Sequence, residues 1–334
     1  MTVLGTTTAL ANGEVAASGD GTGVLVVGAY NAALTISGGR IPRPGETVLA
    51  ARAVWEPGGK AANQAVAIAR FGVACALVCR VGDDELGRQA VEVLASEGLP
   101  TEGLLVSTGR TGLAVVCVDS SGENSISVVQ GVNAELSVDD VDRVLASLRL
   151  AAPVGYVVGQ LECGAELALA LARYTRARGL RFVLNPAPAL RLDPRVYDAV
   201  DLLTPNEHEL ATLTRDAGLP EDASEEVRAR ALLALGVGEV VVTLGAAGAL
   251  WVSRERAVRV RAPHVEAVDT TGAGDAFTGA LVASLVAGQT MRCAVERACR
   301  AGAFSVTKAG VFAGLGREMD TLPTVTPGTP TSWR

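Results

Sequence analysis

Histidines, aromatic side chains and basic residues are scarce in this sequence. It has two histidines, 4% aromatic residues and a formal net charge of -7. The acidic balance provides no basic surface for DNA or RNA, although a local site for an anionic nucleotide remains compatible with it. Because there are only two histidines and no Cys-x-x-Cys pattern, a zinc site is not expected.

The sequence also lacks long apolar blocks and paired cysteine motifs. No apolar stretch approaches the length of a membrane span, and the first residues lack the basic and apolar parts of a secretory signal. We therefore expect a cytoplasmic globular protein, with reduced and mostly buried thiols. The cysteines stand at positions 75, 79, 117, 163, 293 and 299.

What is present is a regular alternation of short apolar runs and helical segments. Val24–Gly28 reads as a buried first strand, and from residue 139 onward predicted strands and helices follow one another. This rhythm predicts an α/β fold: a doubly wound, mostly parallel sheet with helices on both faces. The later predicted strands cover residues 156–158, 182–184, 202–204 and 240–243.

Two segments, 32–56 and 110–131, do not fit this alternation. They alternate weakly in hydropathy, and the second contains a hairpin around residues 120–123, so we expect a small β-sheet that covers the main sheet as a lid. Residues 1–22 and 318–334 are rich in small and polar residues and are expected to be disordered tails. Residues 23–317 would then form one domain.

Polar side chains follow most of the predicted strands. Because ligands bind at the carboxyl ends of strands in parallel sheets, these positions predict one site. The polar positions are Gln160, Glu162, Asn185, Asn206, Glu209, Gly245 and the loop from Asp269 to Asp275.

The loop Asp269–Asp275 carries the strongest chemical signal. It follows an apolar, strand-like run and leads into a helical pattern, with glycines at 272 and 274. Such a turn can direct bare N–H groups and a helix N-terminus at an anion. Asp275 would lie beside that anion, as suits a base that takes a proton from a hydroxyl attacking a phosphoryl group. The alternative for this segment alone is an ordinary turn with Asp275 as a helix cap.

Several separated motifs resemble the ribokinase (PfkB) family of carbohydrate kinases. The similarity extends from about Val24 to Gly316, and the probability that so many motifs agree in order by chance is very small. Neither the Gly-x-x-x-x-Gly-Lys phosphate loop nor a Gly-x-Gly-x-x-Gly fingerprint is present to suggest another nucleotide fold. The matching segments are Asn31-Ala32, Pro44 to Thr47, Gly58 to Lys60, Ala62 to Ala65, Gly82 to Asp84, Gln160 to Glu162, Asn185 to Ala189, Thr204 to Glu207, Thr243 to Gly245 and Asp269 to Asp275.

The resemblance implies an ATP-dependent sugar kinase that phosphorylates a primary hydroxyl, D-ribose first among the substrates. It makes Asp275 the catalytic base and Gly272, Ala273 and Gly274 the anion hole. It implies a homodimer formed through the lid. The net charge of -7 and the lack of a long apolar stretch indicate no nucleic acid or membrane partner. The implied sugar-binding positions are Asn31, Ala33, Gly59, Lys60, Asn63, Glu162 and Asp275.

The same resemblance implies ATP, Mg²⁺ and K⁺ as cofactors. Glu209 would act on Mg²⁺ indirectly. The ATP-binding positions would be Asn206, Thr243, Gly245, Gly248, Gly274 and Cys299. The K⁺ loop, acting mainly through backbone carbonyls, would comprise Asp269, Thr271, Ser305, Lys308, Gly310 and Gly314.

Two residues depart from the ribokinase pattern. Ribokinases have Asn-Ala-Asp where this chain has Asn31-Ala32-Ala33, and glycine where it has Ala61. Loss of a charge-assisted hydrogen bond to the sugar costs about 1.5–3 kcal/mol, so the substrate remains open. The alternatives are another sugar, a sugar acid or a nucleoside, a non-catalytic sugar-binding protein and, remotely, a dinucleotide oxidoreductase.

Overall fold

A computed structural model describes residues 21–120 and 124–316 of the chain. The two predicted tails, 1–22 and 318–334, fall outside the described residues except for Gly21 and Thr22, as does most of the turn predicted at 120–123. No helix within the described ranges is long and apolar enough to span a bilayer.

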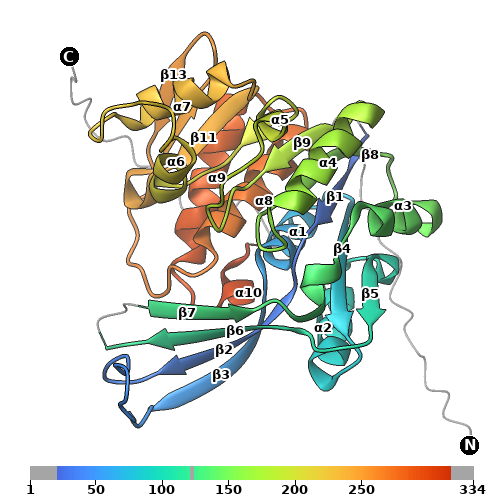
Figure 1. Ribbon diagram of the computed structural model, residues 1–334, viewed down its shortest axis with the longest axis vertical. Coiled ribbons are helices and arrows are strands. Elements are labelled where there is room, and N and C mark those ends of the chain that lie inside the picture. Colours follow the sequence, from blue (N-terminus) through green and yellow to red (C-terminus); the bar gives the residue numbers. More distant parts are fainter. Residues whose placement is uncertain (1–20, 121–123, 317–334) are drawn as a thin grey trace, which may run out of the picture.

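The body of the molecule is built on a nine-stranded sheet (Figure 1). Its strands pair in parallel except β12 and β13, which pair antiparallel at one edge. The order across the sheet is β13-β12-β11-β10-β9-β8-β1-β4-β5. The strands are β1 Gly23–Val27, β4 Cys75–Gly82, β5 Leu104–Ser107, β8 Val154–Gly159, β9 Arg181–Leu184, β10 Leu202–Leu203, β11 Glu239–Thr243, β12 Ala249–Val252 and β13 Ala257–Val260.

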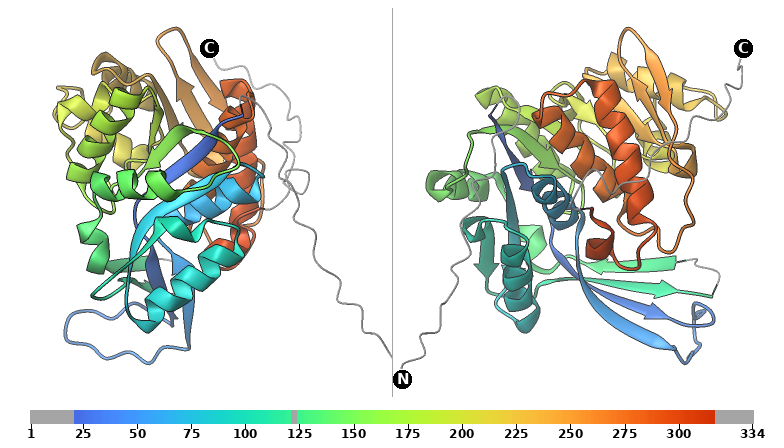
Figure 2. Two further views of the ribbon diagram at one scale, coloured as in Figure 1. Left: turned by 90° about the vertical axis from the view of Figure 1, so that its right-hand side faces the viewer. Right: turned by 180° about the vertical axis from the view of Figure 1, so that it is seen from behind.

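Helices cover both faces of this sheet (Figure 2). Alternate residues of β1 enter two separate cores: Val24 and Val26 pack on one side, Leu25 and Val27 on the other. The first core includes residues of α1 Lys60–Arg70, α2 Glu85–Ser96, α8 Ala273–Val286 and α9 Met291–Ser305, and the second residues of α3 Val138–Ser147, α4 Ala165–Arg178, α5 Pro194–Tyr197, α6 Glu207–Leu213 and α7 Glu225–Ala234. Shorter helices are η1 Thr101–Gly103, η2 Gly131–Glu135, η3 Gly245–Ala247 and α10 Val311–Gly314.

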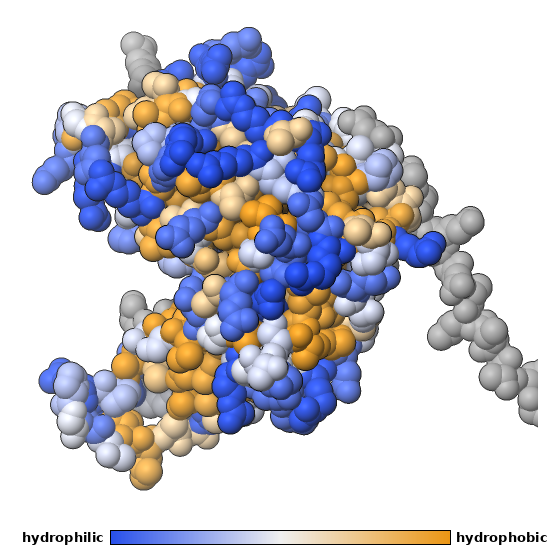
Figure 3. Space-filling model, turned by 45° about the vertical axis from the view of Figure 1, so that its right-hand side comes forward, coloured by the Kyte–Doolittle hydropathy of each residue, from blue (hydrophilic) through white to orange (hydrophobic). Residues whose placement is uncertain are grey.

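A separate four-stranded sheet projects from the carboxyl end of β1 (Figure 1). Its order is β3-β2-β6-β7, and β2 and β6 pair in parallel while the outer pairs are antiparallel. The space-filling view shows a hollow between this sheet, hereafter the lid, and the body (Figure 3). The lid strands are β2 Asn31–Ser37, β3 Arg52–Gly58, β6 Gly112–Val118 and β7 Asn124–Val129. The predicted fold class is confirmed.

Two local predictions were wrong. The run before residues 272–274, hereafter the glycine turn, is not a strand. Strand β13 ends at Val260, and residues 261–270 form no helix or strand. Pro263 lacks the N–H that a strand needs, and the segment connects an edge strand to α8 instead. The thiols are also not mostly buried: Cys75, Cys79 and Cys299 are buried, Cys117 and Cys163 are half-buried and Cys293 is exposed, and all six are free.

Candidate active site

The polar residues predicted at strand ends do gather at one edge of the main sheet. Glu162 follows β8, Asn185 follows β9, Asn206 and Glu209 follow β10, and Gly245 follows β11. Parallel strands end at the same edge, so these side chains come together although they are far apart in the sequence.

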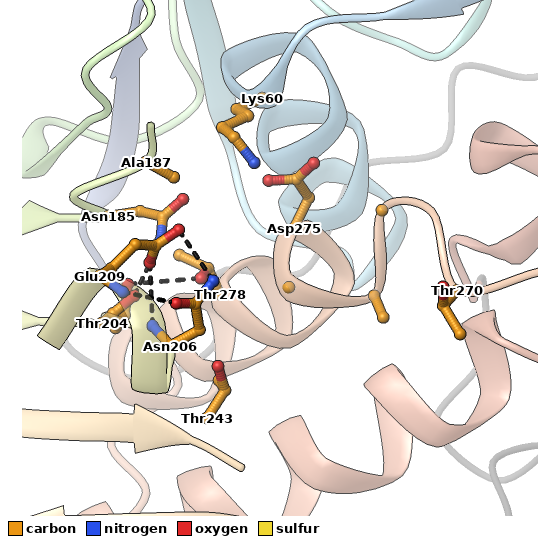
Figure 4. Close-up of a pocket in the computed structure, with 13 residues that line it drawn as sticks. Lys60, Asn185, Ala187, Thr204, Asn206, Glu209, Thr243, Thr270, Asp275 and Thr278 are labelled. Atoms are coloured by element: carbon orange, nitrogen blue, oxygen red, sulfur yellow. Dashed lines mark hydrogen bonds between the residues drawn. The ribbon is translucent and has the colours of Figure 1, made fainter. Parts of the chain in front are cut away.

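A cavity of about 210 Å³ lies at this edge (Figure 4). The glycine turn lies on one side of it, and the N-terminal ends of α1 and α6 lie on the others. It is lined by Lys60, Asn185, Ala187, Thr204, Asn206, Glu209, Thr243, Thr270, Gly272, Ala273, Gly274, Asp275 and Thr278.

The glycine turn has the geometry of an anion site. Gly272 caps α8 with a φ of 77°, in the left-handed region, and no side chain caps this helix. No acceptor in the described part of the chain pairs with the N–H groups of Gly274 and Asp275. A Cβ atom at Gly274 would find nothing within 4 Å, so a ligand can approach the backbone there. Free N–H groups at the N-terminus of a 14-residue helix favour an anion.

Asp275 is buried at the mouth of this turn. Its Oδ2 accepts a hydrogen bond from Asn63 Nδ2 at 2.8 Å, and its Oδ1 accepts one from Gln64 Nε2 at 2.9 Å. The helix cap is Gly272, not Asp275, so the alternative interpretation of Asp275 as a cap is not what the structure shows. A buried carboxylate held by two amides beside an anion site is an arrangement suited to proton abstraction.

Lys60 opposes this carboxylate across the cavity. Its ammonium group points toward the Asp275 carboxylate (Figure 4). The negative charge of Asp275 raises the pKa of Lys60, against the effect of burial, and Glu162 and Glu209 add to the rise. Lys60 therefore remains a cation and offsets the acidic groups around it.

The lid contributes Asn31 to a second cluster next to the cavity. Asn31 Nδ2 donates to Glu162 Oε1 at 3.3 Å, and Lys60 N donates to Glu162 Oε2 at 2.7 Å. Asn133 Nδ2 donates to Asn31 Oδ1 at 3.0 Å and thereby fixes the orientation of that amide. The predicted residues Asn31, Lys60 and Glu162 thus meet, and Asn133 is a member that sequence reasoning missed.

Gly59 connects lid strand β3 to helix α1. Its φ is 92°, and a Cβ atom there would lie 2.5 Å from Ala29 O. Only glycine fits this close approach. Ala33 lies two residues beyond Asn31 on the same face of β2, and its neighbours in the register are Glu56 and Ala114.

Glu162 gives the cluster a pH dependence. Burial raises the pKa of its carboxyl from the ordinary value of 4.5 to about 7, although the charge of Lys60 and the hydrogen bond from its N–H oppose this. Between those two values the folded protein retains a proton that the unfolded chain has released. The contribution of Glu162 to the free energy of unfolding is therefore greatest at low pH and is lost as the pH rises through about 7.

We expect Glu162→Gln, which cannot ionise, to remove this dependence. The thermal midpoint of the unmodified protein should fall relative to that of the variant between about pH 5 and pH 8. Glu166→Gln, at an exposed glutamate in the first turn of α4, serves as the control and should follow the unmodified protein. Parallel curves for the unmodified protein and Glu162→Gln would contradict the assignment.

Asn206 and Glu209 form a reciprocal cap at the start of α6. Asn206 Oδ1 accepts from Glu209 N at 2.8 Å, and Glu209 Oε2 accepts from Asn206 N at 2.8 Å. Both residues also line the cavity. Burial raises the pKa of Glu209 despite this bond. Capping and ligand binding are therefore compatible, and the cap holds the carboxylate in place.

The predicted nucleotide-binding residues divide into two groups. Thr243 lines the cavity, and the turn after it contains Gly245 and Gly248, where a Cβ atom at Gly248 would lie 2.0 Å from Val260 O. Cys299 instead lies in the core on α9, with its Sγ 3.9 Å from Val260 O. It does not line the cavity.

The predicted cation positions lie on two adjacent loops. Asp269 accepts hydrogen bonds from Thr271 N at 2.9 Å and Gly310 N at 3.1 Å, which joins the loops. A Cβ atom at Gly314 would lie 2.8 Å from Ser305 O, so these two predicted positions are also neighbours. The side chain of Lys308 lies over Phe304, with its Nζ 5.6 Å from the centre of that ring.

Glu56 of the lid reaches the same loops and was missed from the sequence. A Cβ atom at Gly310 would lie 2.1 Å from Glu56 Oε1. Burial, followed by the charge of Asp269, raises the pKa of Glu56. In the described ranges, no three His, Cys, Asp or Glu side chains are grouped as a metal site.

Comparison with known proteins identifies the family. The sequence pattern described as pfkB family carbohydrate kinase matches residues 22–315. The chain belongs to the pfkB family of carbohydrate kinases. It is therefore a phosphotransferase of that family, and its fold and site can be compared with those of its relatives.

Relatives of this pfkB kinase include enzymes for two pentoses. It is 36% identical over 291 residues to the deoxyribokinase of Salmonella typhi, covering 86% of this chain and 93% of that protein. It is 36% identical over 304 residues to the ribokinase of Haemophilus influenzae, covering 90% and 97%. The solved structure of Arabidopsis thaliana ribokinase with ribose and ATP has a TM-score of 0.77 and 29% identity, covering 88% of this chain and 96% of that one.

Proposed function

We propose that this protein transfers the γ-phosphoryl group of ATP to the primary hydroxyl of a pentose, with D-ribose as a substrate and D-ribose 5-phosphate as the product. The observation that supports this most is the buried Asp275 carboxylate beside the N-terminus of α8, which no side chain caps. The relatives named above support the choice of a pentose.

Asp275 acts as the base in this proposal. It accepts the proton of the primary hydroxyl as the oxygen attacks the γ-phosphorus. The N–H groups of Gly274 and Asp275 offset the charge that develops on the transferred phosphoryl oxygens, and Lys60 adds a positive charge nearby. Asn31, Asn63 and Glu162 orient the sugar, and the lid excludes water.

The cavity suits ATP and a divalent cation at its other end. The open backbone at Gly274 fits a phosphate group, and Thr243 with the turn after it would face the remainder of the nucleotide. Glu209, a buried carboxylate on the cavity wall, would hold Mg²⁺ through water. Mg²⁺ supplies charge neutralisation on the phosphates.

We also propose a K⁺ ion at the loops that carry Asp269 and Gly310. Two carboxylates, Glu56 and Asp269, lie close together there, and a cation would offset their charge. A homodimer through the lid is our proposal for the assembly. Exposed apolar side chains of the lid support it, namely Trp55, Ile126, Val128 and Val129. Light scattering that gave a monomer mass would contradict it.

The test of the function is ADP release with ATP and Mg²⁺ over a panel of sugars led by D-ribose. Saturable turnover on a pentose supports the proposal. Turnover on a sugar acid, hexose or nucleoside alone would reassign the substrate. Measurable sugar binding with no turnover on any of them would favour a non-catalytic sugar-binding protein.

2-Deoxyribose is a second candidate substrate because of Ala33. On the lid face that carries Asn31, the positions Ala33, Ala114, Gly58 and Gly112 have no hydrogen-bonding side chains, and the carboxylate of Glu56, which stands opposite Ala33 on β3, reaches the loop at Gly310. A sugar that lacks one hydroxyl loses little against such a surface.

We expect Ala33→Asp to lower KM for ribose more than KM for 2-deoxyribose. A new charge-assisted hydrogen bond of about 1.5–3 kcal/mol would lower KM for ribose by roughly tenfold or more. Thr35→Asp places the same charge two residues further along β2 and should leave KM unchanged for both ribose and 2-deoxyribose. Equal effects of Ala33→Asp on the two sugars would show that Ala33 does not face the hydroxyl that distinguishes them.

A further inference from the structure

Gln64 is a fully buried amide directly behind Asp275. Its Nε2 donates to Asp275 Oδ1 at 2.9 Å and to Asn185 Oδ1 at 3.1 Å, and its Oε1 accepts from Gln160 Nε2 at 2.6 Å. Its side chain is 0% exposed. It does not line the cavity, so its contact with the reacting groups passes through Asp275.

The neighbours of Gln64 allow one orientation of its amide. Asn185 Nδ2 donates to Thr204 O at 2.8 Å, so Asn185 presents its oxygen to Gln64. Gln160 Nε2 lies on the opposite side and donates to Gln64 Oε1, so the orientation of Gln64 is set by the oxygens of Asn185 and Asp275 and is compatible with Gln160. If the Gln64 amide were reversed, its oxygen would face two acceptor oxygens and its nitrogen would face a donor. The direction of the hydrogen bond to Asp275 is therefore fixed.

The helix that carries Gln64 is held against the helix that carries Asp275. Gly279 lies one turn after Asp275 on α8, and a Cβ atom there would lie 2.4 Å from Ala67 Cβ on α1. This close packing allows consecutive residues of α1, Asn63 and Gln64, to reach one carboxylate oxygen each. Two donors from one rigid helix set both the position and the rotation of the carboxylate.

We propose that Gln64 is a positioning residue that sets the rotation of the Asp275 carboxylate, with Gln160 holding Gln64 in turn. This inference rests on the proposed role of Asp275 as the base. The hydrogen bond from Gln64 requires an acceptor at Oδ1, so it favours the ionised form that can take up a proton. It also leaves the remaining lone pairs of the carboxylate directed at the cavity.

The test is Gln64→Met, which keeps the length of the side chain and removes both donors. We expect kcat to fall by about 10²-fold, because small misplacements of a catalytic group have effects of that size. KM for the sugar should stay within about threefold, since Gln64 lies outside the cavity. Gln160→Met should lower kcat by about tenfold or less, because it removes one neutral hydrogen bond to Gln64 and does not contact Asp275 directly. Gln89→Met, at an exposed glutamine of α2, is the matched control and should keep both constants.

A double variant separates positioning from a general loss of structure. In the Asp275→Asn background, single-turnover transfer of labelled phosphate should be the same with and without Gln64→Met, because Gln64 acts through the Asp275 carboxylate. A further loss in the double variant would overturn the inference. If Gln64→Met does not fold, Gln64→Asn carries the test: it keeps a buried amide but is one carbon too short to hold both Gln160 and Asp275, so kcat should fall at near-constant KM, and an unchanged kcat would overturn the inference.

The outcomes distinguish this inference from the function on which it rests. Full activity of Asp275→Asn would remove the proposed base and the inference with it. An inactive Asp275→Asn with unchanged kcat and KM in Gln64→Met would overturn only the role of Gln64.

Discussion

Asp275→Asn is expected to lower kcat by about 10²- to 10⁴-fold, the usual contribution of a general base. The amide has the same shape, but it has no lone pair basic enough to take the proton of a hydroxyl. In either rotation of the new amide, its NH₂ group would also face a donor, either Asn63 Nδ2 or Gln64 Nε2. ADP release under saturating ATP and sugar measures the effect.

Asp222→Asn is the matched control for this substitution. Asp222 is exposed and does not line the cavity, so kcat should not change. If Asp275→Asn folds and retains more than about a tenth of kcat, proton abstraction by Asp275 is not a main source of the rate. The glycine turn and Lys60 would then account for the catalysis.

Gly272→Ala is expected to lower both kcat and stability. The residue has a φ of 77°, and its Cβ atom would lie 2.6 Å from Val311 Cγ1. The left-handed conformation alone costs a non-glycine residue about 1–2 kcal/mol. A shift of the turn to relieve the contact would misdirect the N–H groups of α8, and loss of one such donor costs about 10²- to 10³-fold in kcat.

Gly288→Ala separates these two effects. Gly288 has a φ of 75°, nearly that of Gly272, but a Cβ atom there would find nothing within 4 Å. It lies beyond the other end of α8. The control should therefore lose stability by a similar backbone term and keep kcat, as thermal unfolding and steady-state kinetics would show. Equal kcat losses in the two variants would mean that the turn has no special catalytic role.

The periodic parts of the chain predicted the fold because the pattern and the structure follow the same rule. Runs such as Val24–Val27 are buried on both faces, as strands in a parallel sheet must be. The segment before Thr270 was wrongly predicted as a strand because its spaced valines follow a strand pattern. Within the described residues, no neighbouring strand takes up its N–H groups. The antiparallel edge strands β12 and β13 were not recognised either, since short strands carry little pattern.

The candidate site was predicted where residues follow strand ends or form motifs. Asn206, Glu209 and the glycine turn came together as expected, because parallel strands end at one edge. Contacts over long sequence distances escaped prediction. The bond between Gln64 and Asp275 spans 211 positions, and no spacing rule relates the two. Asn133 and Glu56 lie outside the motifs, and only folding brings them to Asn31 and Gly310.

The central claim is that Asp275 and the turn at 272–274 deliver phosphate to a primary hydroxyl. The most direct measurement is the position of the phosphate in the product, by phosphorus–proton NMR after reaction with D-ribose or 2-deoxy-D-ribose, with 5-deoxy-D-ribose in parallel. We expect phosphate on the oxygen at C5 and no turnover of the 5-deoxy sugar. Phosphate at another oxygen, or turnover of the 5-deoxy sugar at a comparable rate, would contradict it.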